Sequence, residues 1–290
     1  VLVADKMYKK GELKALQIIV LSRAFASDAF WSPFFVAFAA ALTYVPNFDK
    51  STILINGLFF AFLAFLITFY DAKTKFDIDS FVGYPISFQT LYLPFLLAVL
   101  TLLTHYINEN LKVIIIVALY SFLITLFVVI FKNGIKNTVN IFKDYHFNEL
   151  PKMKMELSLF IVAGMFGVSV SSLLSGFNIE VPFENYGWQE ASITLFIFIL
   201  LSFIGIHPII AIAIIGDIMS QFNHTLLAIT FLLAWSTTVA TSPFSGLSLT
   251  MQSRYKISAK EILLLNLPYV IKIYIFSVIS LFILDNFIVK

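Results

Sequence analysis

Residues 236–244 read STTVATSPF, and residues 26–34 read ASDAFWSPF. Both runs end in Ser-Pro-Phe and lie inside long apolar segments, at about 224–252 and 13–45. Proline removes a backbone donor and clashes with the preceding turn, so each run predicts a helix interrupted at its proline. In a bilayer, the unpaired backbone groups of such a break are tolerated only where protein or a water-filled cavity receives them. Two breaks at corresponding places in two halves of a chain indicate the binding site of a secondary transporter.

The composition places the chain in a membrane. Hydrophobic residues make up 60% of the 290 residues and charged residues 12%, whereas globular chains are about 45–50% apolar and about 25% charged. The 33 phenylalanines suit a surface that faces lipid. The sequence has no cysteine, which excludes disulfides and thiolate metal sites.

Transmembrane helices need about 20 apolar residues, and the hydrophobic segments of this chain have about that length or more. The predicted segments are 13–45 (broken), 51–71, 85–106, 111–131, 156–176, 191–218, 224–252 (broken) and 264–285. Segment 191–218 is interrupted by Gly205-Ile206-His207-Pro208, which leaves two arms too short to cross singly. The sequence therefore predicts a re-entrant hairpin with Pro208 as its structural break.

The distribution of Lys and Arg sets the expected topology. If the hairpin returns to its starting side, most loop cations fall on one face, among them Lys143, Arg254 and Lys260. The positive-inside rule makes that face cytoplasmic. The two broken helices then run in opposite directions, as in an inverted repeat. We expect a multi-pass protein of the cell inner (cytoplasmic) membrane.

The predicted fold class is an all-α polytopic membrane protein, an inverted repeat with two broken helices and a re-entrant hairpin. Residues 1–71 would be the end of the first repeat, with its broken helix and one span. Residues 72–155 would hold two spans and a basic cytoplasmic linker, 132–155, and residues 156–290 the remainder of the second repeat. Because the chain starts at Val1 in a basic stretch, we expect it to be the C-terminal part of a longer protein.

The chain resembles the ion transporter superfamily, which includes divalent-anion/sodium symporters, arsenite permeases and NhaD-type sodium/proton antiporters. The resemblance lies in Gly205-Ile206-His207-Pro208 at the hairpin, Ser236-Thr237-Thr238 to Ser242-Pro243-Phe244 at the second break, and Ser27-Asp28 to Ser32-Pro33-Phe34 at the first. It implies that hairpin tips and broken helices line the substrate and cation sites. It also implies that a transport domain moves as an elevator against a scaffold.

The breaks themselves offer ligands for ions. Half-helices that begin after Pro33 and Pro243 direct N–H groups toward the midplane, which favours anions, and the carbonyls before each break suit Na⁺. The expected substrate-binding residues are Ser32, Ser236, Thr237, Thr238, Thr241, Ser242, His207 and Arg23. A second interpretation is that these hydroxyls bond back to the helix backbone and the prolines are plain kinks.

Ionisable residues inside spans are rare and usually functional. Arg23 and Asp28 flank the first break. They could pair as a neutral clamp, or Arg23 could bind an anion while Asp28, with Ser27, couples Na⁺ or H⁺. His207 could bind substrate and relay protons, or cap freed carbonyls. Lys272 is expected to snorkel to the cytoplasmic surface.

The sequence thus predicts a secondary active transporter that moves a small ion, preferably an anion, by symport or antiport with Na⁺ or H⁺. The alternatives are a cation/proton antiporter and a non-transporting membrane scaffold or assembly protein. No enzyme motif such as H-E-x-x-H, G-x-S-x-G or a P-loop is present. We expect no metal and no cofactor besides the coupling ion. The expected partners are the ion substrate and the lipid bilayer, with a homodimer left open and nucleic acid excluded.

Overall fold

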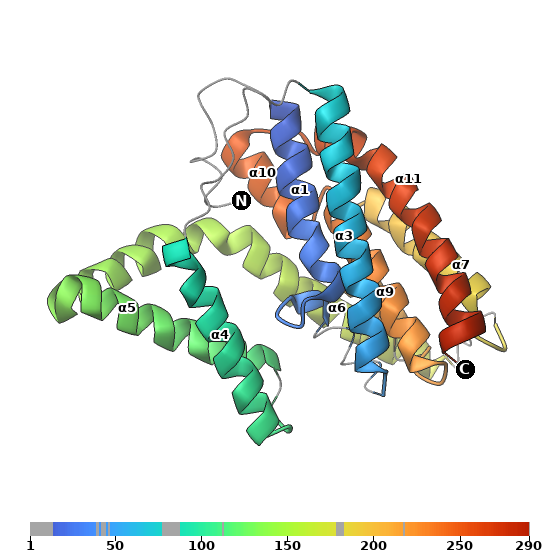
Figure 1. Ribbon diagram of the computed structural model, residues 1–290, viewed down its shortest axis with the longest axis horizontal. Coiled ribbons are helices and arrows are strands. Elements are labelled where there is room, and N and C mark those ends of the chain that lie inside the picture. Colours follow the sequence, from blue (N-terminus) through green and yellow to red (C-terminus); the bar gives the residue numbers. More distant parts are fainter. Residues whose placement is uncertain are drawn as a thin grey trace. The chain divides into compact units, whose positions relative to one another are not determined.

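The computed structural model describes residues 14–38, 41, 45, 47–76, 88–111, 113–177, 183–216 and 218–289. Every regular element in these ranges is a helix (Figure 1). The chain divides into two compact units, one formed by Val1–Gly83 with Ser158–Lys290 and the other by Tyr84–Leu157. The expected all-helical class is confirmed for the described residues, whereas the inverted repeat stays a prediction.

The larger unit holds most of the helices. They are α1 (Lys14–Trp31), α3 (Lys50–Lys75), all but the first turn of α6 (Lys154–Gly176), α7 (Trp188–Phe203), α8 (Pro208–Ile215), α9 (His224–Val239), α10 (Gly246–Tyr255) and α11 (Ala259–Ile283). Polar side chains fix where several of them begin: Asp49 caps α3, Asn223 caps α9 and Ser258 caps α11. Each accepts a hydrogen bond from an N–H group that has no partner within the helix.

The smaller unit is built from α4 (Phe88–Ile107) and α5 (Val113–Asp144). Helix α5 bends at Gly134, whose φ of 74° lies in the left-handed region. Helical turns continue through Tyr145–Glu149 and Leu150–Met153. The expected linker 132–155 is therefore helical over nearly its whole length.

Among the residues that the structure describes, three helices are long and apolar enough to cross a membrane: Lys50–Lys75, Val113–Glu149 and Ala259–Ile288. Their best windows have mean hydropathies of 2.3, 3.1 and 2.1. Lipid-facing surface explains why large side chains such as Phe65 and Phe69 of α3 remain 63% and 54% exposed. The length and apolar composition of these helices indicate a membrane protein.

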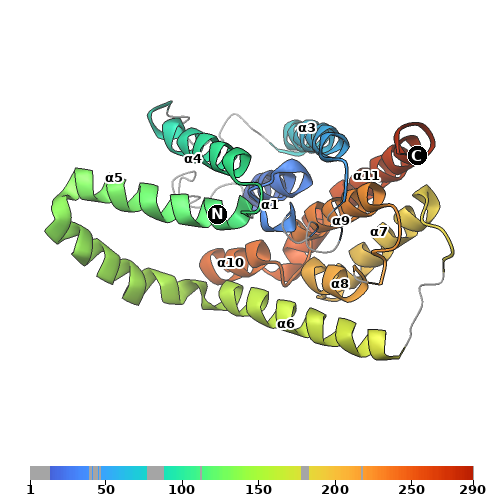
Figure 2. The same cartoon turned by 90° about the horizontal axis from the view of Figure 1, so that it is seen from below.

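Helix α9 forms the core of the larger unit. Every residue from Thr225 to Val239 is buried, as expected of a helix that is surrounded on all sides. Figure 2 shows α9 in the middle of this unit, with α1, α3, α7, α8 and α11 around it, and these helices contact it. Protein thus covers 15 of the 16 residues of this helix, and only His224 at its start is partly exposed.

Helices α7 and α8 form the hairpin expected in 191–218. The turn between them spans residues 204–207, and Gly205 has a φ of 99°, which favours glycine. Pro208 occupies the first turn of α8, where its missing N–H costs no helical hydrogen bond. The helix–turn–helix is confirmed, and its re-entrant position in a membrane stays a prediction.

The first break packs tightly against α3 at Gly57. A Cβ atom there would meet the carbonyl oxygen of Phe30 and would lie 2.8 Å from Cα of Trp31. We predict that Gly57→Ala lowers the free energy of unfolding by about 1–3 kcal/mol, because backbone cannot yield as a flexible side chain can. Thermal unfolding of the purified protein measures this. Gly164→Ala on α6, which meets no atom within 4 Å, is the control; equal melting temperatures for both variants would contradict the packing.

Candidate functional site

Three helices meet at a buried ionic cluster. Arg23 of α1 donates from Nη1 to Oδ2 of Asp71 on α3 at 2.8 Å, and Lys272 of α11 donates from Nζ to Oδ1 at 2.9 Å. Lys75 lies 3.5 Å from the same Oδ1. The side chains of Arg23 and Asp71 are 0% and 1% exposed, and that of Lys272 is 40% exposed. Three cations share one carboxylate, so the cluster carries net positive charge.

The guanidinium of Arg23 is held from several directions. Its Nε donates to Oδ1 of Asn266 at 2.9 Å, and Nη2 donates to the carbonyl oxygen of Leu265 at 3.2 Å. The guanidinium carbon lies 4.5 Å from the centre of the Tyr269 ring, within the range of a cation–π contact. A buried charge needs such partners because desolvation otherwise costs several kcal/mol. The cluster is a preorganised structure that α1, α3 and α11 build together.

The structure gives Arg23 a different partner from the one considered in the sequence. It pairs with Asp71 rather than with Asp28, whose side chain is exposed on α1. Ser27 donates to the carbonyl oxygen of Ala24 in its own helix. Lys272 does not extend freely to a surface, because its ammonium group ends on Asp71.

Sequence reasoning missed Asp71 and Asn266. Asp71 is the last residue of the expected span 51–71. A carboxylate at a membrane boundary can be solvated, so its position did not indicate a buried partner. Asn266 could have been found, since it is a polar residue within the apolar segment 264–285. Its Nδ2 donates to the carbonyl oxygen of Ala240 at 2.9 Å, which satisfies one acceptor where α9 ends.

Both expected helix breaks are present. Helix α1 ends at Trp31, just before Ser32-Pro33-Phe34, and α9 ends at Val239, just before the second break. The side chains of Ser32 and Ser242 are buried, at 9% and 0% exposure. Helix α10 then begins at Gly246, with Ser245 as its N-cap.

Most hydroxyls of the second break bond to nearby helical carbonyls. Thr237 donates to Leu233 O, Thr238 to Trp235 O, and Thr241 to Thr237 O and Thr238 O. These bonds match the interpretation in which Ser and Thr satisfy their own helix. Two serines differ. Ser236 donates across to Ala26 O of α1 at 2.5 Å, and the buried hydroxyl of Ser242 has no partner among the described residues.

The two breaks do not lie together. Helices α1 and α9 run antiparallel, since Ala26 faces Ser236 and Asn266 bridges Ser22 to Ala240. Ser32 therefore lies beyond this contact in one direction, and Ser242 lies beyond it in the other. At 1.5 Å rise per residue, the two serines are separated by roughly 18 Å along the helices. The expectation that they share one central site is wrong, because each break terminates its helix at the opposite end of the pair.

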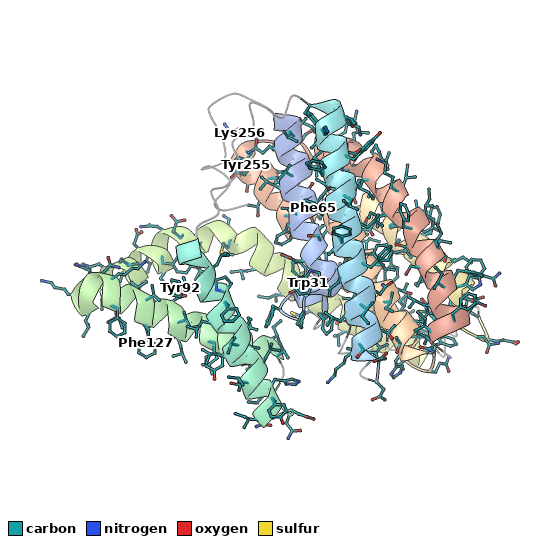
Figure 3. All side chains as sticks on the ribbon, viewed as in Figure 1. Trp31, Phe65, Tyr92, Phe127, Tyr255 and Lys256 are labelled. Carbon is teal, nitrogen blue, oxygen red and sulfur yellow. The ribbon has the colours of Figure 1, made fainter. Side chains whose placement is uncertain are left out.

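The side-chain view locates the end of α1 and the end of α10. Figure 3 labels Trp31 at the lower end of α1 and Tyr255, the last residue of α10, near the top of the same unit. The turn between α7 and α8 contacts residues on both sides of the second break. A Cβ on Gly205 would meet the ring of Phe244, and the ring of His207 packs edge-on against Trp235 with centroids 5.4 Å apart.

His207 marks the start of α8. Its Nδ1 accepts a hydrogen bond from Ile209 N at 3.2 Å, so it caps a backbone N–H group at the start of the helix, whereas the cap expected from the sequence was one of freed carbonyls. The side chain is 2% exposed. The turn before α8 thus brings His207 against Trp235, which precedes the second break, and buries it there; its expected role in substrate binding stays a prediction.

A cavity of about 450 Å³ lies between α1 and α3 beside the ionic cluster. Arg23, Ser27 and Thr68 contribute polar groups to its wall, and the remaining wall is apolar, including Phe65 and Phe69. Figure 3 labels Phe65 on α3. In the part of the chain that the structure describes, no three His, Asp or Glu side chains gather closely enough to hold a metal ion.

Comparison with known proteins does not assign this chain to a family. No protein-family model, no curated protein and no solved structure matches this chain. The contacts within the candidate site therefore carry the functional inference, above all the ion pairs of the cluster.

The energetics of the cluster can be tested with two variants of matched chemistry. Asp71→Asn leaves Arg23 buried without its counter-ion, so we predict a loss of about 3–5 kcal/mol in the free energy of unfolding. Lys75→Gln removes a cation that is 46% exposed, and we predict a change of about 0–1 kcal/mol. Denaturant or thermal unfolding in one detergent measures both. Similar values for the two variants would show that Asp71 is solvated rather than buried.

Proposed function

We propose that this protein is a secondary active transporter for a small anion, and that the cluster of Arg23, Asp71 and Lys272 binds the anion. The observation that carries the proposal is the excess of cations over carboxylate at a place where three helices meet. Two of these helices, α3 and α11, are long and apolar enough to cross a membrane. Ionisable groups at such positions usually mark an ion pathway.

The cluster suggests how an anion and a coupling ion would exchange. The side chain of Lys272 is 40% exposed although its ammonium group bonds Asp71, and the guanidinium of Arg23 has the planar donors that suit carboxylate or phosphate oxygens. An incoming anion would bind Lys272 and take the place of Asp71 on Arg23. The carboxylate that is released would then accept H⁺ or Na⁺, so that anion and cation bind together. Asp71 thereby takes the coupling role that the sequence assigned to Asp28.

The helix breaks support the mobile element that a transporter requires. The hairpin tip rests on the second break through Gly205 and His207. Asn266 joins that break to the ionic cluster, because its amide bonds Ala240 O and its carbonyl oxygen accepts from Arg23. A change in the bonding of Arg23 therefore reaches the end of α9 directly.

A second candidate function is a membrane scaffold without transport. It is favoured by the hydroxyls of the second break, which are largely satisfied by nearby backbone. In this alternative the ionic cluster is a clamp between helices. The two proposals differ in one respect that can be measured, since a clamp has no use for an added anion.

The proposal predicts anion-dependent stability. Carboxylates, sulfate and phosphate are each added to the purified protein with and without Na⁺, at neutral and acidic pH. A bound anion at about 100 times its Kd stabilises the folded state by about 2.7 kcal/mol, which raises the melting temperature. We predict that at least one anion does so, that Lys272→Gln removes most of the shift, and that Asp28→Asn leaves it unchanged.

Transport is then measured in proteoliposomes with the anion that raises the melting temperature. Uptake should depend on the gradient of H⁺ or of Na⁺ and should fail in Lys272→Gln. A wild-type protein that stays folded and responds to no anion, or an anion effect that persists in Lys272→Gln, would favour the scaffold.

A further inference from the structure

Two neighbouring cavities lie at the end of the larger unit away from the ionic cluster. The first, of about 350 Å³, is an apolar slot between α3 and α11, with Phe59 and Ile279 on its facing walls. The second, of about 430 Å³, is a polar chamber where α3 and α9 begin, with Asp49 and Thr225 among its lining residues. Both volumes fall within the range of ligand sites.

The slot and the chamber adjoin each other. Thr52 of α3 and Ile288 near the end of the chain line both of them. Between α3 and α11, Ser280 donates to Oδ1 of Asn56 at 2.6 Å. The result is one groove that is apolar along its length and polar at one end, which is the polarity of a lipid.

The slot faces the membrane. Ile55 and Phe59 on α3 are 70% and 52% exposed, and Ile279 on α11 is 49% exposed. Both helices can cross a membrane, so hydrocarbon is the natural solvent for these side chains. An acyl chain that lies in the slot would cover them.

The chamber is held in shape by hydrogen bonds between segments. The backbone N–H of Asp49 donates to Oγ1 of Thr225 at 2.9 Å, and that of Asn47 donates to Nδ1 of His224 at 3.2 Å. Asn223 caps α9 through hydrogen bonds from the backbone N–H groups of Thr225 and Leu226. The polar wall is therefore fixed before any ligand arrives.

Asp49 is the charged side chain in the chamber wall. The hydroxyl of Thr52 and the backbone N–H of Ser51 donate to its carboxylate and lower its pKa below the ordinary value. The carboxylate is thus ionised at neutral pH and repels a headgroup with net negative charge. An ammonium group would be attracted, and the neighbouring hydroxyl and amide groups can bond to phosphate oxygens.

We propose that this groove binds a phospholipid with a primary-amine headgroup, with the ammonium at Asp49 and an acyl chain in the slot between α3 and α11. The site is independent of the proposed anion site. Asp71 and Asp49 stand near opposite ends of α3, roughly 33 Å apart at 1.5 Å per residue. A transport assay therefore does not test whether this groove binds a lipid, whatever its result.

Native mass spectrometry of the purified, delipidated protein tests the proposal directly. Phosphatidylethanolamine and phosphatidylglycerol with identical chains are added in equal amounts. We predict that the wild type retains phosphatidylethanolamine about tenfold more than phosphatidylglycerol, the factor expected of one hydrogen bond to a charged group. Asp49→Asn should bring this ratio close to one, because asparagine caps a helix as well as aspartate but carries no charge.

A second pair of variants tests the slot. Ile279→Trp fills it and should reduce retention of both lipids, whereas Leu264→Trp, at a position on α11 that is 55% exposed and outside the groove, should match the wild type. Circular dichroism checks that each variant folds. If Ile279→Trp does not fold, the ratio of retained phosphatidylethanolamine to phosphatidylglycerol in Asp49→Asn decides alone. Preference for phosphatidylglycerol, or an unchanged ratio in Asp49→Asn, would overturn the proposal. So would a protein dimer that Ile279→Trp dissociates, since a second copy would then occupy the groove.

Discussion

The buried pair of Arg23 and Asp71 is the strictest constraint in the larger unit, because neither charge can lose its partner without the other being left buried. Two charges at 0% and 1% exposure must be matched almost completely, because an unpaired charge in a low-dielectric interior is strongly destabilising. Lys272 and Asn266 supply the remaining partners. These bonds join α1, α3 and α11 at one place beside the buried helix α9.

A buried ion pair is a poor way to gain stability. Well-packed apolar side chains of similar volume hold helices together as well or better, and most of the buried side chains in this unit are apolar. Charge at this place is therefore better explained by function. The cluster is also connected: Asn266 links Arg23 to Ala240, and the hairpin tip rests on the residues that follow.

Local signals in the sequence predicted the elements well, and long-range pairing was not predictable. Pro33, Pro243 and the turn before Pro208 mark real helix ends because proline acts on its own neighbours. The basic composition of 132–155 predicted a cytoplasmic linker and no helix, although Ile135, Val139 and Phe142 repeat with helical spacing. The hydrophobic pattern of the sequence does not indicate that Arg23 pairs with a carboxylate 48 residues away. The pattern also does not indicate that two helices with matching breaks run antiparallel and place those breaks far apart.

The most direct test replaces the charged pair with apolar side chains. In Arg23→Met with Asp71→Leu, no buried charge is left unpaired, so the account predicts a melting temperature close to that of the wild type in the absence of anions. The same variant should lose the anion-dependent rise in melting temperature completely. A double variant that remains folded and still responds fully to the anion would contradict the claim that this cluster is the anion site.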